Sequence, residues 1–124
     1  MPKILIMEDD ETLVKMYTKK LQHEGFEVVA AYSGGEGLIA APREKPDLIL
    51  LDIMMPAVDG FEVIKNLKAV PETKNIPIVI LTNLGTSDVF IQEAHSLGVK
   101  NYLVKYKTSA EDVVKTIRQE LNIK

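Results

Sequence analysis

Short segments that are apolar almost throughout constrain the fold of this chain more than any other feature. Residues 47–51 (DLILL) and 78–81 (IVIL) contain almost no polar side chain. A strand with one face in water alternates apolar and polar residues, so these segments are predicted to be buried on both faces. Burial on both faces is typical of a parallel sheet that helices cover on each side.

Strand-like and helix-like segments alternate along the whole chain. The predicted strands are residues 3–7, 27–31, 47–51, 76–82 and 101–104. The predicted helices are residues 10–23, 34–43, 60–68, 86–97 and 110–121, the last with apolar residues at helical spacing and Thr108 or Ser109 as its N-cap. This alternation predicts a doubly wound α/β domain with right-handed crossovers and helices on both faces of the sheet.

Length, charge and cysteine content exclude several classes of protein. The 124 residues suffice for one domain with a hydrophobic core, and the absence of cysteine excludes disulfides, thiolate zinc sites and cysteine nucleophiles. A net charge of −3 does not favour direct nucleic-acid binding. The chain has neither a signal peptide nor an apolar run of about 18–20 residues, so we expect no membrane insertion and a cytoplasmic protein.

Polar residues follow four of the predicted strands. They are Glu8, Asp9 and Asp10 after the first, Asp52 after the third, Thr82 at the end of the fourth and Lys105 after the fifth. In doubly wound folds ligands bind beyond the carboxyl ends of the strands. We therefore expect Glu8, Asp9, Asp52, Thr82 and Lys105 to converge at one edge of the sheet.

Three acids, one hydroxyl and one amine in such a pocket suit phosphoryl chemistry. Crowded carboxylates repel one another unless a cation lies among them, and oxygen ligands without His or Cys favour Mg²⁺. Lys105 and Thr82 would then bind phosphate oxygens. Asp52 is the best candidate nucleophile, because it stands alone after a central strand while Glu8 and Asp9 form a metal-binding pair.

Each of these residues also has a purely structural interpretation. An acid that follows a strand is often a helix cap or a turn residue, and we expect Asp10 to cap the first helix. Taken alone, Thr82 and Lys105 are more often structural or solvated residues. The functional interpretation depends on all the strand ends together.

The same residues lie in motifs that closely resemble the receiver domain of bacterial two-component response regulators, especially single-domain regulators of the chemotaxis type. The matching segments are residues 4–11 (ILIMEDDE), 47–56 (DLILLDIMMP) with Asp59-Gly60, 78–82 (IVILT), and Ala94, Gly98, Tyr102 and Lys105. The resemblance spans residues 3–121. It implies one receiver domain over residues 1–124, with a flavodoxin-like (βα)5 fold and strand order 2-1-3-4-5.

The resemblance also implies a phosphoryl donor and a metal. A histidine kinase or a histidine phosphotransfer protein would supply the phosphoryl group to Asp52. Mg²⁺ would be bound directly by Asp9, through water by Glu8, and by the backbone carbonyl of Met54. The cognate kinase, the downstream target and phosphorylation-dependent formation of a homodimer stay open. So does the choice between a free-standing receiver and a part of a longer protein.

A conformational switch is a further implication. Phosphorylation adds about −1.5 to −2 charges. Movement of Thr82 toward the phosphate would vacate space beneath the fourth helix that the Tyr102 ring can fill, which biases a two-state equilibrium. The affected surface would comprise the fourth helix, the fifth strand and the fifth helix. On sequence alone, Tyr102 is equally well a half-buried aromatic residue of a strand.

Two positions depart from the family pattern. Tyr106 follows Lys105 where the family usually has proline, often in a cis bond. A non-prolyl cis bond costs about 3–4 kcal/mol, so the bond geometry and the aim of Lys105 are open. Asn83 replaces a small residue and is expected to narrow the access of donors to Asp52. Met54 and Leu84 flank the site and are expected to shield the acyl phosphate from water.

Two other classes of function compete with the signalling switch. A magnesium-dependent phosphohydrolase of the haloacid-dehalogenase type expects a second aspartate two residues after the first, where this chain has Met54. A receiver-like binding scaffold that is not regulated by phosphorylation is the other alternative, and Tyr106 alone favours it. We expect a signalling phosphoacceptor that catalyses only its own phosphoryl transfer and dephosphorylation.

Overall fold

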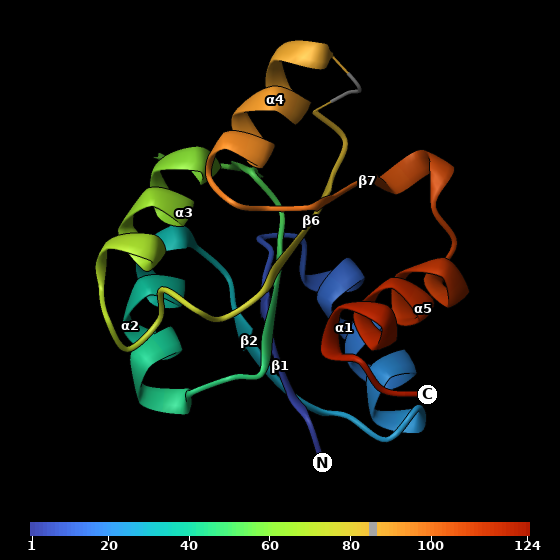
Figure 1. Ribbon diagram of the computed structural model, residues 1–124. Coiled ribbons are helices and arrows are strands. Elements are labelled where there is room, and N and C mark those ends of the chain that lie inside the picture. The colour runs from blue at the N-terminus through green and yellow to red at the C-terminus, as the bar shows by residue number, and fades with distance from the viewer. Residues whose placement is uncertain (85–86) are drawn as a thin grey trace.

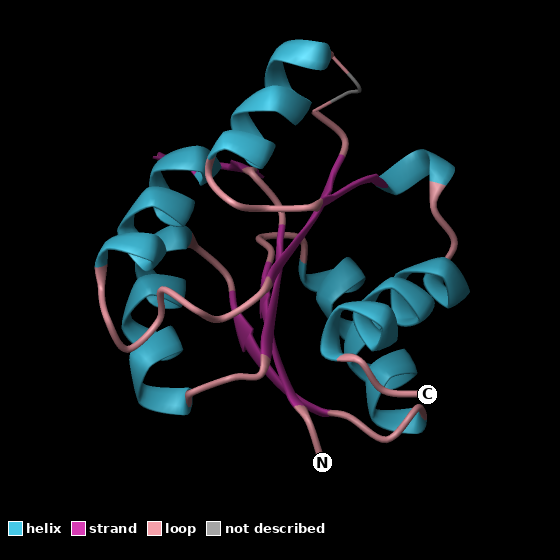
Figure 2. Cartoon of the chain, viewed as in Figure 1, coloured by secondary structure: helices cyan, strands magenta, loops and turns pink. Residues whose placement is uncertain are grey.

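A five-stranded parallel sheet forms the centre of the molecule in the computed structural model, which describes residues 1–84 and 87–124. Its strands are β1 (Lys3–Met7), β2 (Glu27–Ala31), β3 (Leu48–Leu51), β6 (Ile78–Thr82) and β7 (Asn101–Val104). Their order across the sheet is β2-β1-β3-β6-β7, and each neighbouring pair is parallel (Figures 1 and 2). The predicted doubly wound, flavodoxin-like fold and its strand order 2-1-3-4-5 are confirmed.

In the described part of the chain, five helices cover the two faces of this sheet. They are α1 (Glu11–His23), α2 (Gly34–Glu44), α3 (Gly60–Ala69), α4 (Asp88–Ser96) and α5 (Ala110–Leu121). Helices α1 and α5 lie on one face, whereas α2, α3 and α4 lie on the other (Figure 1). Among the described residues, no helix is long and apolar enough to span a lipid bilayer.

The central strands are apolar on both sides because each side meets a layer of helices. In β3, Ile49 and Leu51 belong to the core beneath α2 and α3, while Leu48 and Leu50 belong to the core beneath α1 and α5. All four residues are buried. Side chains alternate across a strand, so an apolar run of this kind is stable only between two apolar layers.

Several helix ends have the caps that the sequence indicates. The Asp10 carboxylate accepts hydrogen bonds from the backbone N–H groups of Thr12 and Leu13 at 3.0 and 3.2 Å, so it caps α1 as expected. The Ser109 hydroxyl accepts one from Asp112 N at 3.1 Å and caps α5. These side chains satisfy N–H groups that have no partner within the helix.

Some predicted boundaries shift by one or two residues. Strand β3 begins at Leu48 rather than at residue 47, although Asp47 N donates to Lys3 O at 2.7 Å and the Asp47 carboxylate accepts a hydrogen bond from Lys3 N at 2.7 Å. Strand β6 begins at Ile78 rather than at residue 76, and Pro77 has no N–H group for the ladder. Helices α2 and α3 each end one residue later than predicted. The predicted fourth helix begins at residue 86, which lies outside the described residues, and α4 begins at Asp88.

Two small elements have no counterpart in the sequence prediction. Strands β4 (Met54–Met55) and β5 (Val58–Asp59) form an antiparallel hairpin directly after Asp52, with Ala57 in the left-handed region at a φ of 67°. A 3₁₀ turn, η1 (Lys105–Lys107), follows β7. Both elements lie at the carboxyl edge of the sheet, where the predicted site residues gather.

Candidate functional site

Three carboxylates meet at the carboxyl edge of the sheet. Glu8 follows β1 and Asp52 follows β3, and each continues its strand by one ladder bond, from Glu8 N to Ala31 O and from Asp52 N to Met7 O, both 3.0 Å. Glu8, Asp9 and Asp52 each offer a carboxylate oxygen, and these oxygens lie within 4.8 Å of one another. Glu8 and Asp52 are only 5% exposed, whereas Asp9 is exposed to solvent.

Lys105 reaches into this group from the end of β7. Its Nζ lies 2.6 Å from Glu8 Oε1 and 2.8 Å from Asp52 Oδ2. The Lys105–Tyr106 peptide bond is trans, so the amine reaches the carboxylates without a cis bond. Burial lowers the pKa of Lys105, but its hydrogen bonds with Asp52 and Glu8 outweigh that effect and hold the pKa above its usual value. Lys105 is therefore an ammonium ion.

Burial disfavours the charged form of Glu8 as well, and for an acid this raises the pKa. Desolvation raises the pKa of Glu8 to about 7, although the hydrogen bonds from Lys105 and from Asp10 N lower it, and the charge of Asp52 adds to the rise. One lysine thus compensates only part of the negative charge of three neighbouring carboxylates. An all-oxygen donor set with excess negative charge fits a hard divalent cation such as Mg²⁺.

Asp52 is held at both of its carboxylate oxygens. Oδ1 accepts a hydrogen bond from Met54 N at 2.9 Å, and Oδ2 is paired with Lys105. Met54 lies in β4, so the hairpin brings the Met54 backbone directly to Asp52. The Met54 side chain is half exposed beside the site.

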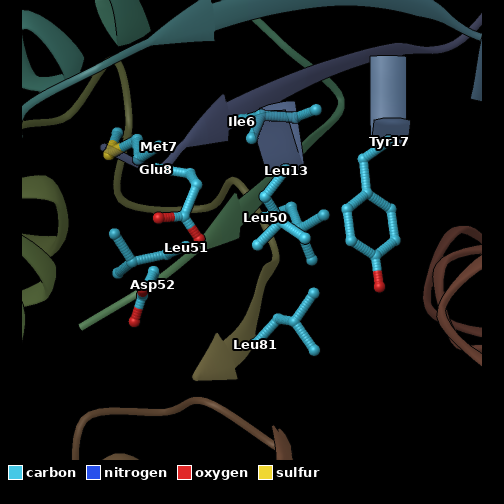
Figure 3. Close-up of a pocket in the computed structure, with 9 residues that line it drawn as sticks. All are labelled: Ile6, Met7, Glu8, Leu13, Tyr17, Leu50, Leu51, Asp52 and Leu81. Carbon is cyan, nitrogen blue, oxygen red and sulfur yellow. The ribbon is translucent and has the colours of Figure 1, made fainter. Parts of the chain in front are cut away.

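Figure 3 shows a small pocket whose lining includes the two buried acids, Glu8 and Asp52. Glu8 and Asp52 are among the residues that line a small cavity of about 10 Å³, and the others are Ile6, Met7, Leu13, Tyr17, Leu50, Leu51 and Leu81. A cavity of this size holds one water molecule at most. Its mostly apolar lining accounts for the desolvation of Glu8, and it leaves the outer side of the carboxylates as the place for ligands.

Thr82 lies at the same edge of the sheet, at the end of β6. The register pairs Leu51 with Ile80, so Thr82 extends one residue beyond the level of Asp52. The Thr82 side chain is fully buried, and its hydroxyl accepts a hydrogen bond from Leu84 N at 3.2 Å. Leu84 itself is partly buried against the core on the α4 side.

Tyr102 lies in β7, where it pairs with Ile80. Its ring packs against the same core as α4, and its hydroxyl is buried without a hydrogen-bond partner in the described part of the chain. Burial, with a smaller effect of the Asp52 charge, raises the pKa of Tyr102. The half-buried position of Tyr102 fits both interpretations drawn from the sequence, a ring that moves in a switch and a structural aromatic residue of a strand.

One contact near the site was not foreseen from the sequence. Asn83 Oδ1 accepts a hydrogen bond from Tyr106 N at 3.2 Å, which joins the loop after β6 to the turn after β7. The sequence feature that could have indicated this contact is Tyr106 in place of proline, because any residue other than proline has a backbone N–H that can donate. Its acceptor, 23 residues earlier, is set by the packing of the sheet.

The fold and this edge of the sheet define a class of protein: a doubly wound α/β domain with an acidic, lysine-containing site at the carboxyl ends of its strands. The model of the response regulator receiver domain matches residues 4–118. The chain belongs to the response regulator receiver domain family, whose members are signalling proteins of two-component systems.

Individual relatives agree with this assignment. The chain is 36% identical over 126 residues to Protein PilH of Pseudomonas aeruginosa, covering 98% of both chains. It is 42% identical over 103 residues to Response regulator PleD of Caulobacter vibrioides, covering 83% of this chain but only 22% of PleD. Among solved structures, chemotaxis protein CheY4 of Vibrio cholerae has a TM-score of 0.88 and 34% identity, covering 96% of this chain and 98% of CheY4.

Proposed function

We propose that this chain is a phosphorylation-activated switch whose phosphoacceptor is Asp52. The observation that carries the proposal is the direct contact of Lys105 with Asp52 and Glu8 inside a group of three carboxylates. An unregulated scaffold has no need for a partly buried lysine paired with two buried acids, because such an arrangement costs desolvation energy. The phosphoryl donor is a histidine kinase or a histidine phosphotransfer protein, as is general in this family.

The transfer step is a substitution at phosphorus. A carboxylate oxygen of Asp52 attacks the phosphoryl group, a P–O bond forms, and the P–N bond to the donor histidine breaks with its electron pair returning to the imidazole. Lys105 exchanges its contact with Asp52 Oδ2 for one with a phosphoryl oxygen, and the Thr82 hydroxyl donates to another. The product is an aspartyl phosphate.

The donor set fits Mg²⁺, and residues of this chain would supply its ligands. Asp9 and Asp52 would hold it through carboxylate oxygens, Met54 through its backbone carbonyl, and Glu8 through water. When bound, Mg²⁺ supplies the positive charge that offsets the repulsion between Asp52 and the incoming phosphoryl group. The half-exposed Met54 and the partly buried Leu84 flank the acyl phosphate and hinder the approach of water.

The same event is proposed to shift the surface formed by α4, β7 and α5. Thr82 leaves the Leu84 N–H for the phosphate, and the Tyr102 ring moves into the space that this opens. The absence of a partner for the Tyr102 hydroxyl in the described residues supports this step, because no hydrogen bond has to break. A structural neighbour at 32% identity and a TM-score of 0.86 is the "BeF3-activated N-terminal receiver domain" of Klebsiella pneumoniae RstA.

The partners of this switch follow from the family. A downstream protein or output domain reads the shifted surface, and pairing of two copies through it on phosphorylation is one such output. We place the chain in the cytoplasm, where receiver domains typically act. We propose neither direct nucleic-acid binding nor membrane insertion for this chain.

Intact-mass measurement tests the proposal. The wild-type protein is incubated with Mg²⁺ and acetyl phosphate, alongside Asp52→Ala and, as a matched control, Asp88→Asn, which alters an exposed aspartate outside the site. We expect wild type and Asp88→Asn to gain one phosphoryl group, and EDTA or Asp52→Ala to abolish the gain. Equal gain in Asp52→Ala would overturn the assignment of the phosphoacceptor.

A further inference from the structure

The loops that carry Thr82 and Lys105 are tied to each other. Strands β6 and β7 are paired with Thr82 opposite Val104, so both chains leave the sheet side by side. Immediately beyond this pair, Asn83 Oδ1 accepts the hydrogen bond from Tyr106 N at 3.2 Å. The contact therefore joins the two loops at the point where the site begins.

The peptide group between Lys105 and Tyr106 is held on both sides. Its N–H donates to Asn83, and its carbonyl, Lys105 O, accepts a hydrogen bond from Thr108 N at 3.4 Å. Lys105 thus has a fixed backbone next to its Cα, while its side chain extends to two carboxylates at 2.6 and 2.8 Å. A lysine side chain has four flexible carbons, so its aim depends on how firmly its backbone is held.

We propose that Asn83 is a positioning residue, whose side-chain oxygen holds the Tyr106 N–H and thereby aims Lys105 at the phosphoryl group that Asp52 accepts. This inference rests on the proposed function. It differs from a simple narrowing of donor access by Asn83, because it assigns the effect to a hydrogen-bond acceptor and not to the size of the side chain.

Asn83→Leu separates the two explanations. Leucine matches asparagine in the number and branching of its side-chain heavy atoms but offers no acceptor, and position 83 is exposed, so the variant is expected to fold. If the side chain acts through its size alone, the loss of rate in Asn83→Leu grows with the size of the donor. If the hydrogen bond matters, Asn83→Leu is slower and its Tyr106 N–H is less protected.

Amide hydrogen exchange provides a measurement that needs no phosphoryl donor. We expect the Tyr106 amide to exchange about twofold to tenfold faster in Asn83→Leu than in wild type, since one hydrogen bond of ordinary strength is lost. The Ile80 amide in the buried β6 strand serves as the internal control for global stability. Unchanged exchange at Tyr106 would overturn the proposal.

Phosphorylation rates supply the functional measurement. With Mg²⁺, we expect Asn83→Leu to reduce the rate about twofold to tenfold with acetyl phosphate and by the same factor with phosphoramidate, because Lys105 contacts the phosphoryl group that both donors share. A loss that depends on the size of the donor would instead indicate a steric gate. A wild-type rate with both donors would also overturn the proposal.

A double-mutant cycle isolates the contact. Tyr106→Pro removes the N–H donor, whereas Tyr106→Ala removes the ring and keeps the donor. We expect Asn83→Leu to slow phosphorylation in the Tyr106→Ala background and to have no further effect in the Tyr106→Pro background. An equal effect in both backgrounds would contradict the proposal.

Failure of wild type itself to accept a phosphoryl group would overturn the proposed function, and the exchange measurement would still report whether the contact forms.

Discussion

Tyr102 places a hydroxyl group in the protein interior without giving it a partner among the described residues. A buried hydroxyl that makes no hydrogen bond is a cost to folding, since in the unfolded chain water satisfies it. The ring, in contrast, contributes apolar contacts with the core on the α4 side. The two parts of this side chain therefore have opposite effects on stability.

Substitution of Tyr102 separates these effects. We expect Tyr102→Phe to leave the free energy of unfolding unchanged or to raise it by up to about 1 kcal/mol, because only the unpaired hydroxyl is removed. Tyr102→Ala should lower it by about 2 kcal/mol through loss of the half-buried ring. Urea denaturation measures both values. A clear loss of stability in Tyr102→Phe would show that the hydroxyl has a partner.

The apolar side chains of Met54 and Leu84 are proposed to control the lifetime of the acyl phosphate. Met54 is 50% exposed in the hairpin next to Asp52, and Leu84 donates its backbone N–H to the Thr82 hydroxyl. Polar replacements at these positions let water approach the phosphate. We expect Met54→Asn and Leu84→Glu to shorten the lifetime about threefold, which corresponds to about 0.7 kcal/mol in the barrier.

The control for these variants is an exposed apolar residue farther along the chain. Val89→Asn alters a 67% exposed side chain on α4 and should leave the lifetime unchanged. The decay of the phosphorylated mass after removal of the donor gives the three lifetimes. Lifetimes in Met54→Asn and Leu84→Glu that equal the Val89→Asn value would refute the shielding role.

At the scale of the elements, the start of α3 packs closely against the segment that carries Asp52. A Cβ atom on Gly60 would lie 2.3 Å from the Cα of Ile53, which is a backbone atom that cannot rotate away. Ile53 directly follows Asp52, and Gly60 N donates to Ile53 O at 3.3 Å. The close approach of α3 thus fixes the segment that carries the phosphoacceptor.

Gly60→Ala tests this packing. We expect it to lower the free energy of unfolding by about 2–3 kcal/mol and to slow phosphorylation of Asp52, because Ile53 has to move. Gly35→Ala in α2 is the matched control, since its nearest neighbour, Ser33 Oγ, is 4.0 Å away. That variant should keep its stability or gain about 0.5–1 kcal/mol. Equal stabilities of the two variants, measured by thermal unfolding, would contradict the account.

The sequence predicts long-range architecture here better than it predicts short elements. Strands β1, β2 and β7 begin and end where their composition indicates, because strands of four or five residues carry a recognisable pattern. Strands β4 and β5 have two residues each, too few for any periodicity. Their hairpin depends on a left-handed residue, Ala57, and on the contact with α3.

In the site, too, some features could be predicted from the sequence and others could not. Glu8, Asp9, Asp52 and Lys105 follow their strands directly in the sequence, so the parallel order of the strands is enough to predict that they meet. The hydrogen bond from Tyr106 N to Asn83 joins side chain to backbone across 23 residues. Its formation depends on the conformation of two loops, which the sequence pattern alone does not specify.

At the scale of the whole molecule, the charged site lies at the carboxyl edge of the sheet. The surface formed by α4, β7 and α5 is proposed to change when the site is phosphorylated. The acidic group lies where β1 and β3 end, and Lys105 extends β7 toward it. Strand β7 also lies at the outer edge of the sheet, beside the α4 and α5 helices. Phosphorylation of Asp52 can therefore reach the surface of α4, β7 and α5 through Lys105, which directly follows β7.

Beryllofluoride, an analogue of a phosphoryl group, tests that route. With Mg²⁺ present, we expect beryllofluoride to change the amide exchange rates in α4, β7 and the start of α5 at least about threefold. The exchange rates in α2 should stay nearly unchanged, because a shift between two conformations affects only the segments in which they differ. Asp52→Ala is the control for specific binding. Changes spread evenly over all five helices would contradict a localised switch.

The central claim is that Asp52 accepts the phosphoryl group, and its most direct test is to locate that group chemically. Borohydride reduces an acyl phosphate but spares free carboxylates, so it marks the phosphorylated aspartate permanently. After incubation with Mg²⁺ and acetyl phosphate, followed by reduction and digestion, peptide sequencing by mass spectrometry identifies the marked position. We predict homoserine at position 52 and none in the EDTA sample. A mark at Asp9, Asp10 or Asp59 instead would contradict the account.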